Sequence, residues 1–169
     1  VRSCLMNGKL YPDFTRSPSL DRPKYRFHTL NECQQPSILG YGVMAVPVPH
    51  GVPSAGMLVS SQQASLFYTG DTGRGLSSAW RWVSPALLVV EVTYSSRWEK
   101  QAMDSGHMTP AILAGELRLF QKEKGYLPRV LTVHMHPAME KEIQKELSEV
   151  SRELGIDIVP GRDGLKFTV

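Results

Sequence analysis

The sequence predicts an α/β layered domain, because apolar runs of strand length alternate with helical segments in its second half. Residues 86–90 are continuously apolar, as expected for a strand that is buried on both faces. Residues 138–154 carry apolar side chains at helical spacing and charged side chains on the opposite face. The order of elements, strands first and then strand–helix–strand–helix–strand, favours a sheet that is covered by helices.

The first half of the chain reads as a loop followed by short strands. Residues 1–37 are rich in proline, serine, arginine and aspartate, and we expect them to be irregular. A β-type run at 41–46 should end at residues 47–50, because proline cannot donate a ladder hydrogen bond. The runs at 56–59 and 66–69 are separated by a polar turn, which predicts a hairpin.

The second half contains clear start and stop signals for helices. Thr109 can cap a helix whose first turn accommodates Pro110, and Gly125 is suited to ending that helix after Lys124. The remaining elements are expected in this order: a short helix at 76–82, strands at 129–133 and 157–159, and a closing strand at 165–169.

The composition is that of a globular protein with 41% hydrophobic and 21% charged residues, and 169 residues are enough for one domain with a core. The net charge of +3 is small and the basic residues are scattered, which disfavours nucleic acid as a partner. The two cysteines, Cys4 and Cys33, do not form a Cys-x-x-Cys pair, so a cytoplasmic setting is expected. No apolar run approaches the roughly 20 residues of a membrane helix, so no membrane is expected as a partner.

Three polar residues stand directly after predicted strands, namely His50, Asp71 and His134. Functional groups gather where the strands of an open α/β sheet end. Two imidazoles and a carboxylate are chemically sensible ligands for zinc, manganese or iron, and a carboxylate can bridge two metals. The alternatives are that each histidine is an ordinary loop residue and that Asp71, between Gly70 and Gly73, simply forms a turn.

Glu91 and His107 form a second candidate pair. Glu91 closes the apolar run at 86–90, and a carboxylate in that position needs a partner. His107 stands just before a helix start, where an imidazole held by a carboxylate could protonate a leaving alkoxide. Alternatively, His107 caps the helix or Glu91 pairs with an arginine. His136 is interpreted as a loop residue near the site without a metal contact, with a second metal ligand as the alternative.

The segments around these residues resemble the metallo-β-lactamase superfamily, and within it the class II 3′,5′-cyclic-nucleotide phosphodiesterases and ribonuclease Z. Each segment is short, but their order and spacing together are specific. The matching segments are 46–56, 66–73, 91–94, 105–111 and 133–137.

The resemblance implies an αββα sandwich and a role for each candidate residue. His50, Asp71 and His134 would be metal ligands, with Asp71 bridging two divalent ions, zinc first and manganese or iron as alternatives. A metal-bound hydroxide would attack phosphorus, while Glu91 would orient His107 as the proton donor to the leaving group.

One departure from the family is large. The family opens with a His-x-His-x-Asp-His motif, whereas the first histidine of this chain is His28, which stands alone. We therefore expect residues 1–169 to be a single domain of this fold that is incomplete at its N-terminus, with a loop region at 1–37 and a core at 38–169. The chain alone would bind metal weakly and hydrolyse nothing. Two smaller departures are Gly51, where threonine is common, and His136, where asparagine is common.

The leading functional hypothesis is hydrolysis of a small-molecule phosphodiester, with 3′,5′-cyclic nucleotides first. One alternative is endonucleolytic processing of the tRNA 3′ end, which the absence of a basic cluster disfavours. Hydrolysis of a thioester or a lactam is a further alternative, as is an inactive half that acts as a binding module. A sheet edge left uncovered would favour association into a homodimer.

Overall fold

The computed structural model describes residues 3–168. The chain forms two compact units, Val1–Leu30 and Asn31–Val169. The described residues of the first unit are turns and bends, with one bridge between Pro18 and Pro23. In this unit the Phe14 ring packs edge-on against Tyr25, with ring centroids 5.6 Å apart, and Lys24 lies 5.3 Å from the centroid of Phe14.

The second unit is built on a mixed sheet. In the part of the chain that the structure describes, the strands form one seven-stranded sheet in sequence order. The first four strands are antiparallel, and β4 to β7 are parallel to one another. The strands are β1 (Ser37–Ile38), β2 (Tyr41–Val48), β3 (Ser54–Ser60), β4 (Ser65–Tyr68), β5 (Leu87–Glu91), β6 (Arg129–Val133) and β7 (Ile158–Pro160). The α/β fold class is confirmed.

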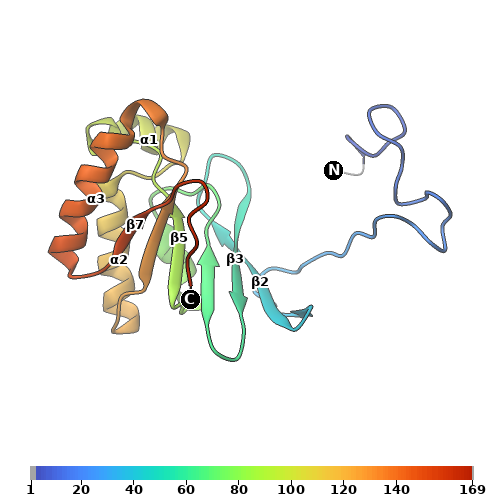
Figure 1. The fold of residues 1–169 in the computed structure, drawn as a ribbon, viewed down its shortest axis with the longest axis horizontal. Coiled ribbons are helices and arrows are strands. Elements are labelled where there is room, and N and C mark those ends of the chain that lie inside the picture. The colour runs from blue at the N-terminus through green and yellow to red at the C-terminus, as the bar shows by residue number, and fades with distance from the viewer. Residues whose placement is uncertain (1–2, 169) are drawn as a thin grey trace. The chain divides into compact units, whose positions relative to one another are not determined.

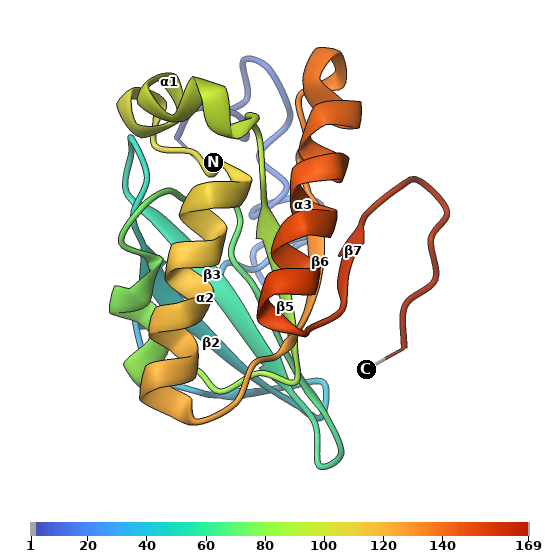
Figure 2. The ribbon, with the colours of Figure 1, turned by 90° about the vertical axis from the view of Figure 1, so that its left-hand side faces the viewer.

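The helices of this unit gather on one face of the sheet (Figures 1 and 2). Trp80 is fully buried under this layer and packs edge-on against Phe67 and Phe120, with ring centroids 6.5 and 5.1 Å away. The long helix α2 begins and ends as predicted, because Thr109 accepts a hydrogen bond from the Ile112 amide and Gly125 takes a left-handed conformation. The helical segments are η1 (Leu76–Trp82), η2 (Ser96–Trp98), α1 (Glu99–Ser105), α2 (Pro110–Lys124), η3 (Pro137–Met139) and α3 (Glu140–Leu154).

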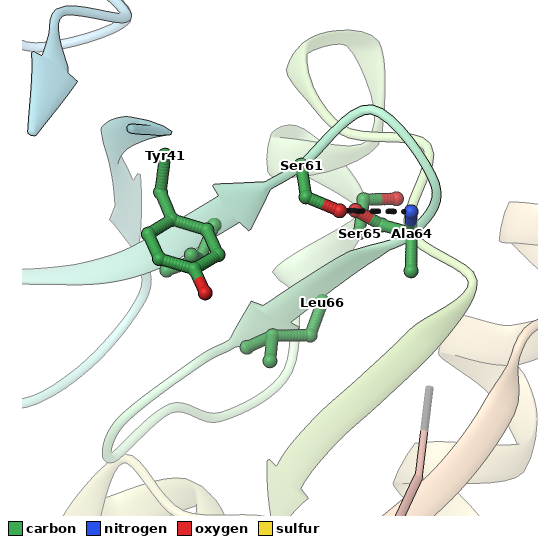
Figure 3. A pocket seen from close by; sticks show the side chains of 6 residues that line it. Tyr41, Ser61, Ala64, Ser65 and Leu66 are labelled. Atoms are coloured by element: carbon green, nitrogen blue, oxygen red, sulfur yellow. Dashed lines mark hydrogen bonds between the residues drawn. The ribbon is translucent and has the colours of Figure 1, made fainter. Parts of the chain in front are cut away.

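The opposite face of the sheet, which we call the open face, carries apolar side chains that are not fully buried. Side chains alternate between the two faces of a strand. Buried helix-side residues such as Leu58 and Leu88 therefore alternate with partly exposed ones such as Val59 and Val89. An apolar hollow of about 150 Å³ lies near the β3–β4 turn, lined by Tyr41, Val59 and Leu66 among others (Figure 3). This hollow is at the N-terminal end of β4 and is remote from the polar residues that follow the strands.

Strand β2 extends two residues beyond the predicted end and includes Pro47, so that boundary was wrong. The Val43 amide donates to the Pro36 carbonyl and the Ala45 carbonyl accepts from the Cys33 amide, so the odd-numbered residues of β2 direct their backbone polar groups away from β3. Pro47 has the same parity. Its missing N–H therefore removes no hydrogen bond between β2 and β3, as is typical of proline on an edge strand.

The predicted closing strand at 165–169 was also wrong for residues 165–168, which form no strand, and Val169 lies outside the described residues. This segment is held by side-chain contacts instead. The Arg129 guanidinium lies 4.4 Å from the Phe167 ring centroid and donates to the Thr168 carbonyl at 3.0 Å. In the described part of the chain, no helix is long and apolar enough to cross a membrane.

Candidate metal centre

The polar residues singled out from the sequence all lie at one edge of the sheet. Strands β2, β4, β5 and β6 run in the same direction, because β3 is antiparallel to both β2 and β4 while β4, β5 and β6 are parallel. Their C-terminal ends therefore meet at the same edge, the place where α/β folds assemble sites. His50, Asp71 and His134 follow β2, β4 and β6, and Glu91 ends β5.

Glu91 is the centre of the hydrogen-bonding network. Its side chain is 1% exposed and accepts from donors on both oxygens. Oε1 accepts from the Thr72 amide at 2.9 Å and from His107 Nδ1 at 2.5 Å. Oε2 accepts from the Thr93 hydroxyl at 2.6 Å and from the Met108 amide at 3.2 Å. A buried carboxylate needs such donors, and here two backbone amides and two side chains supply them.

His107 is the partner of Glu91, which decides between the alternatives left open by the sequence. Glu91 pairs with this imidazole rather than with an arginine, and Thr109 rather than His107 caps α2. The backbone places His107 directly after Gly106, which ends α1 at a φ of 75°. Because Nδ1 donates to Glu91, the Nε2 atom is the one available to other molecules, and the side chain is 16% exposed.

His50 packs against His107, with ring centroids 5.0 Å apart. Its Nδ1 lies 2.8 Å from the Gly106 carbonyl oxygen, so Nδ1 carries the proton and donates this hydrogen bond. The contact requires glycine, because a Cβ atom at Gly106 would lie 2.6 Å from the Gly51 amide nitrogen. The loops after β2 and α1 are thus held together through a close backbone approach.

Asp71 and His134 form the exposed side of the site. His134 Nδ1 lies 3.8 Å from Asp71 Oδ1, and the two side chains are 53% and 47% exposed. The His134 ring stacks near His107 with centroids 5.6 Å apart. His134 also has a φ of 61°, a left-handed conformation that costs a non-glycine residue about 1–3 kcal/mol and is frequent at functional sites.

The arrangement of the imidazoles fits a divalent metal. The Nδ1 atoms of His50, His107 and His134 each face a hydrogen-bond partner, namely a carbonyl, a carboxylate and a hydroxyl. Metal-ligating histidines usually bind through one nitrogen while the other is held in this way. His50, His134 and the neighbouring Asp71 carboxylate therefore offer suitable donors, and His107 links the first two through ring contacts.

The set of described residues that meets the distance requirement for a metal is a different one, which leaves out His50 and Asp71. Among the described residues, Glu91, His107 and His134 have candidate ligand atoms that all lie within 4.8 Å of one another. However, the Thr93 hydroxyl oxygen lies 2.6 Å from Glu91 Oε2, and 3.4 and 2.9 Å from Nδ1 of His107 and His134. A hydroxyl group thus joins these three side chains, so we interpret them as a hydrogen-bonded cluster rather than a ligand set.

His136 is used locally. Its Nδ1 accepts from the Ala138 amide at 3.2 Å at the start of η3, and its ring stacks on Tyr94. No role was predicted for Thr93 or Thr72, although both donate a hydrogen bond to Glu91. The spacing of Thr93 was a usable signal, since residues two apart on an extended chain share a face.

Residues 6–135 match the family described as the beta-lactamase superfamily domain. The match covers well over half of the chain. The chain belongs to the beta-lactamase superfamily. A search of curated proteins found no match.

Solved structures of this superfamily's fold resemble the chain. The metallo-beta-lactamase fold protein YhfI from Bacillus subtilis is 16% identical, with a TM-score of 0.68 over 85% of this chain and 56% of that one. A diphosphatase of the PhnP family is 15% identical, with a TM-score of 0.61 over 87% of this chain and 50% of that one. The short form of human tRNase Z is 18% identical, with a TM-score of 0.52 over 76% of this chain and 42% of that one.

This chain thus spans about half the length of the superfamily structures that it matches. At these identities the likeness establishes the fold, which confirms the predicted metallo-β-lactamase class. The finer resemblance to cyclic-nucleotide phosphodiesterases stays a prediction.

Proposed function

We propose that the protein containing this superfamily domain is a hydrolase of phosphodiester bonds that uses two divalent metal ions, zinc first, with 3′,5′-cyclic nucleotides as the leading substrates. The observation that carries the proposal is the pair of Glu91 and His107. A buried carboxylate holds an imidazole at 2.5 Å, at the strand ends where Asp71 and His134 also lie. Such a group accelerates hydrolysis of an unactivated phosphodiester, because protonation makes the alkoxide a better leaving group.

His50, Asp71 and His134 would hold the metals. Their two imidazoles and one carboxylate are a donor set that suits zinc, manganese or iron. When bound, divalent metals lower the pKa of water and neutralise charge on phosphoryl oxygens. The hydrogen bonds on Nδ1 of His50 and His134 fix the orientation of each ring before any metal binds.

His107 would deliver a proton from Nε2 to the leaving oxygen. Its Nδ1–H donates to Glu91, so Nε2 is the nitrogen that faces the leaving oxygen. Glu91 is itself held by the Thr72 and Met108 amides, which keeps the imidazole in one orientation. General acid catalysis of this kind contributes about 10²–10⁴-fold to the rate.

The test is the dependence of rate on the leaving group, measured with full-length protein loaded with zinc or manganese. The variant His107→Gln should lose about 10²–10⁴-fold on cyclic AMP, whose leaving group is a poor alkoxide, and far less on bis(p-nitrophenyl) phosphate. His136→Gln is the matched control, because it changes a histidine at the same sheet edge that contacts neither Glu91 nor His134 in the described structure. Equal losses on both substrates would refute proton donation by His107.

The substrate class is tested in the same assay. Turnover of cyclic AMP by the wild-type protein supports the proposal, and removal of metal with a chelator should abolish it. Cleavage of a precursor tRNA without turnover of cyclic AMP would mean that the substrate is tRNA and not a cyclic nucleotide. Metal-independent turnover, or none with any phosphodiester, would overturn the assignment as a metal-dependent phosphodiesterase.

A further inference from the structure

Thr93 stands between the buried carboxylate and the exposed histidine. Its side chain is 7% exposed, and its hydroxyl oxygen lies 2.6 Å from Glu91 Oε2 and 2.9 Å from His134 Nδ1. Val92 points into the core under the helices, so Glu91 and Thr93 both lie on the opposite side of the extended chain. Thr93 thereby reaches β6, the strand that precedes His134.

The number of protons on Glu91, Thr93 and His134 determines which group donates in each of the two hydrogen bonds of the Thr93 hydroxyl. Glu91 already accepts from the Thr72 amide, the Met108 amide and His107, which is the environment of an ionised carboxylate. A carboxylate has no proton to donate, so the Thr93 hydroxyl must donate its single proton to Glu91. The hydroxyl can then only accept from His134, and Nδ1 of His134 must carry a proton.

We propose that Thr93 is a positioning residue that extends the influence of Glu91 to His134. One buried carboxylate then sets the tautomer of two histidines: His107 directly, and His134 through the threonine hydroxyl. The consequence is that His134 presents Nε2 as its free nitrogen. The idea rests on the proposed metal site where it concerns binding, whereas the tautomer itself is a property of the metal-free protein.

His134 depends on this contact more than a buried histidine would. Its side chain is 53% exposed, and its backbone has a φ of 61°. Few packing contacts therefore restrict its ring. In the described structure the Thr93 hydroxyl supplies the hydrogen bond of this ring, and Asp71 stands further away at 3.8 Å. Removing the hydroxyl should let the ring rotate and populate both neutral tautomers.

The chain offers a matched control on the neighbouring strand. Thr132 in β6 is fully buried, and its hydroxyl has no hydrogen-bond partner among the described residues. Thr132→Val and Thr93→Val therefore make the same chemical change at buried positions near His134. Only the second change removes hydrogen bonds. Thr93→Ser retains the hydroxyl and tests whether the hydrogen bonds, rather than the methyl group, carry the effect.

The primary measurement is nitrogen NMR of the histidine rings in metal-free full-length protein, at a pH where the rings are neutral. Wild type, Thr93→Ser and Thr132→Val should show His134 with its proton on Nδ1. Thr93→Val should show a mixture of tautomers for His134 while His107 keeps its proton on Nδ1. A wild-type His134 with its proton on Nε2 overturns the proposal, whether or not the valine variant folds.

The second measurement is zinc affinity by competition with a chelator. Thr93→Val should weaken zinc binding by about 10–100-fold, the usual effect of losing an outer partner of a metal-ligating histidine. Thr93→Ser should recover most of this loss, and Thr132→Val should cause none. Equal losses for both valine variants would mean that altered packing weakens zinc binding. This result would refute the proposed role of the Thr93 hydroxyl. If the wild type binds no zinc, the proposed metal site is refuted. The tautomer of His134 in the metal-free protein still tests the role of Thr93.

Discussion

The two sides of the site differ in how firmly they are held. On the inner side, Glu91 is buried and accepts hydrogen bonds from four donors, and His107 is bound to it directly. On the outer side, Asp71 and His134 are about half exposed and lie 3.8 Å apart. The difference separates a buried pair that is held by several hydrogen bonds from an exposed pair in which the His134 ring is oriented by its hydrogen bond to the Thr93 hydroxyl. Groups that are held in place before the reaction stabilise developing charge without having to reorganise.

The inner side should be the more sensitive to substitution. We expect Glu91→Gln to destabilise the fold by about 3–5 kcal/mol, because the amide cannot accept from all four donors and leaves buried groups unpaired. Glu142→Gln is the control, since Glu142 pairs with an exposed Arg97 at 3.0 Å and should cost less than about 1 kcal/mol. Urea unfolding of both variants measures the contrast. Similar midpoints would mean that the Glu91 network contributes little to stability.

The close approach of the loops that follow β2 and α1 can be tested by substituting Gly106. Gly106 and Gly125 both have left-handed conformations, with φ values of 75° and 77°. A Cβ atom would meet the Gly51 amide at Gly106, whereas at Gly125 it would meet no atom of the described residues within 4 Å. Gly125→Ala should cost about 1–2 kcal/mol for the backbone conformation alone. Gly106→Ala should cost about 1–3 kcal/mol more, because the loops must separate.

Unfolding midpoints of the two alanine variants give this difference, and the His50 ring signals show whether its hydrogen bond to the Gly106 carbonyl survives. Equal costs at the two glycines would contradict the close loop approach.

On the outer side, we expect the left-handed backbone conformation of His134 to lower the stability of the fold. His134→Gly should be more stable than His134→Ala by about 1–2 kcal/mol, because glycine accepts the φ of 61° without penalty. At His136, whose φ is −66°, the order should reverse, with alanine about 0.4–1 kcal/mol more stable. Thermal unfolding of the four variants tests the prediction. The same order at both positions would remove the argument for strain at His134.

The sequence was sufficient to predict the ends of those elements that carry their own start and stop residues. Helix α2 carries its cap at Thr109 and its stop at Gly125, and both work as predicted. The end of β2 could not be predicted in this way, because the tolerance for Pro47 depends on which edge of the strand its nitrogen faces. That orientation is a property of the sheet and not of the residue.

The candidate site followed a similar pattern. The position of each polar residue after a strand predicted that they would share one edge of the sheet, and the pairing of Glu91 with His107 was anticipated. The spacing of Thr93 could have paired it with Glu91, but its contact with His134 was not anticipated, because that contact joins residues that follow two different strands. The assignment of His50, Asp71 and His134 as ligands stays a prediction until metal binding is measured.

The open face of the sheet has a consequence for regulation of the site. Glu91 and Thr93 have the same parity along the chain as the partly exposed Val89, so the cluster lies at the rim of that apolar surface. A molecule or segment that covered this surface would also lie beside the Glu91–Thr93 cluster. If such a layer changes the affinity of the site for substrate, substrate must change the affinity for that layer by the same factor.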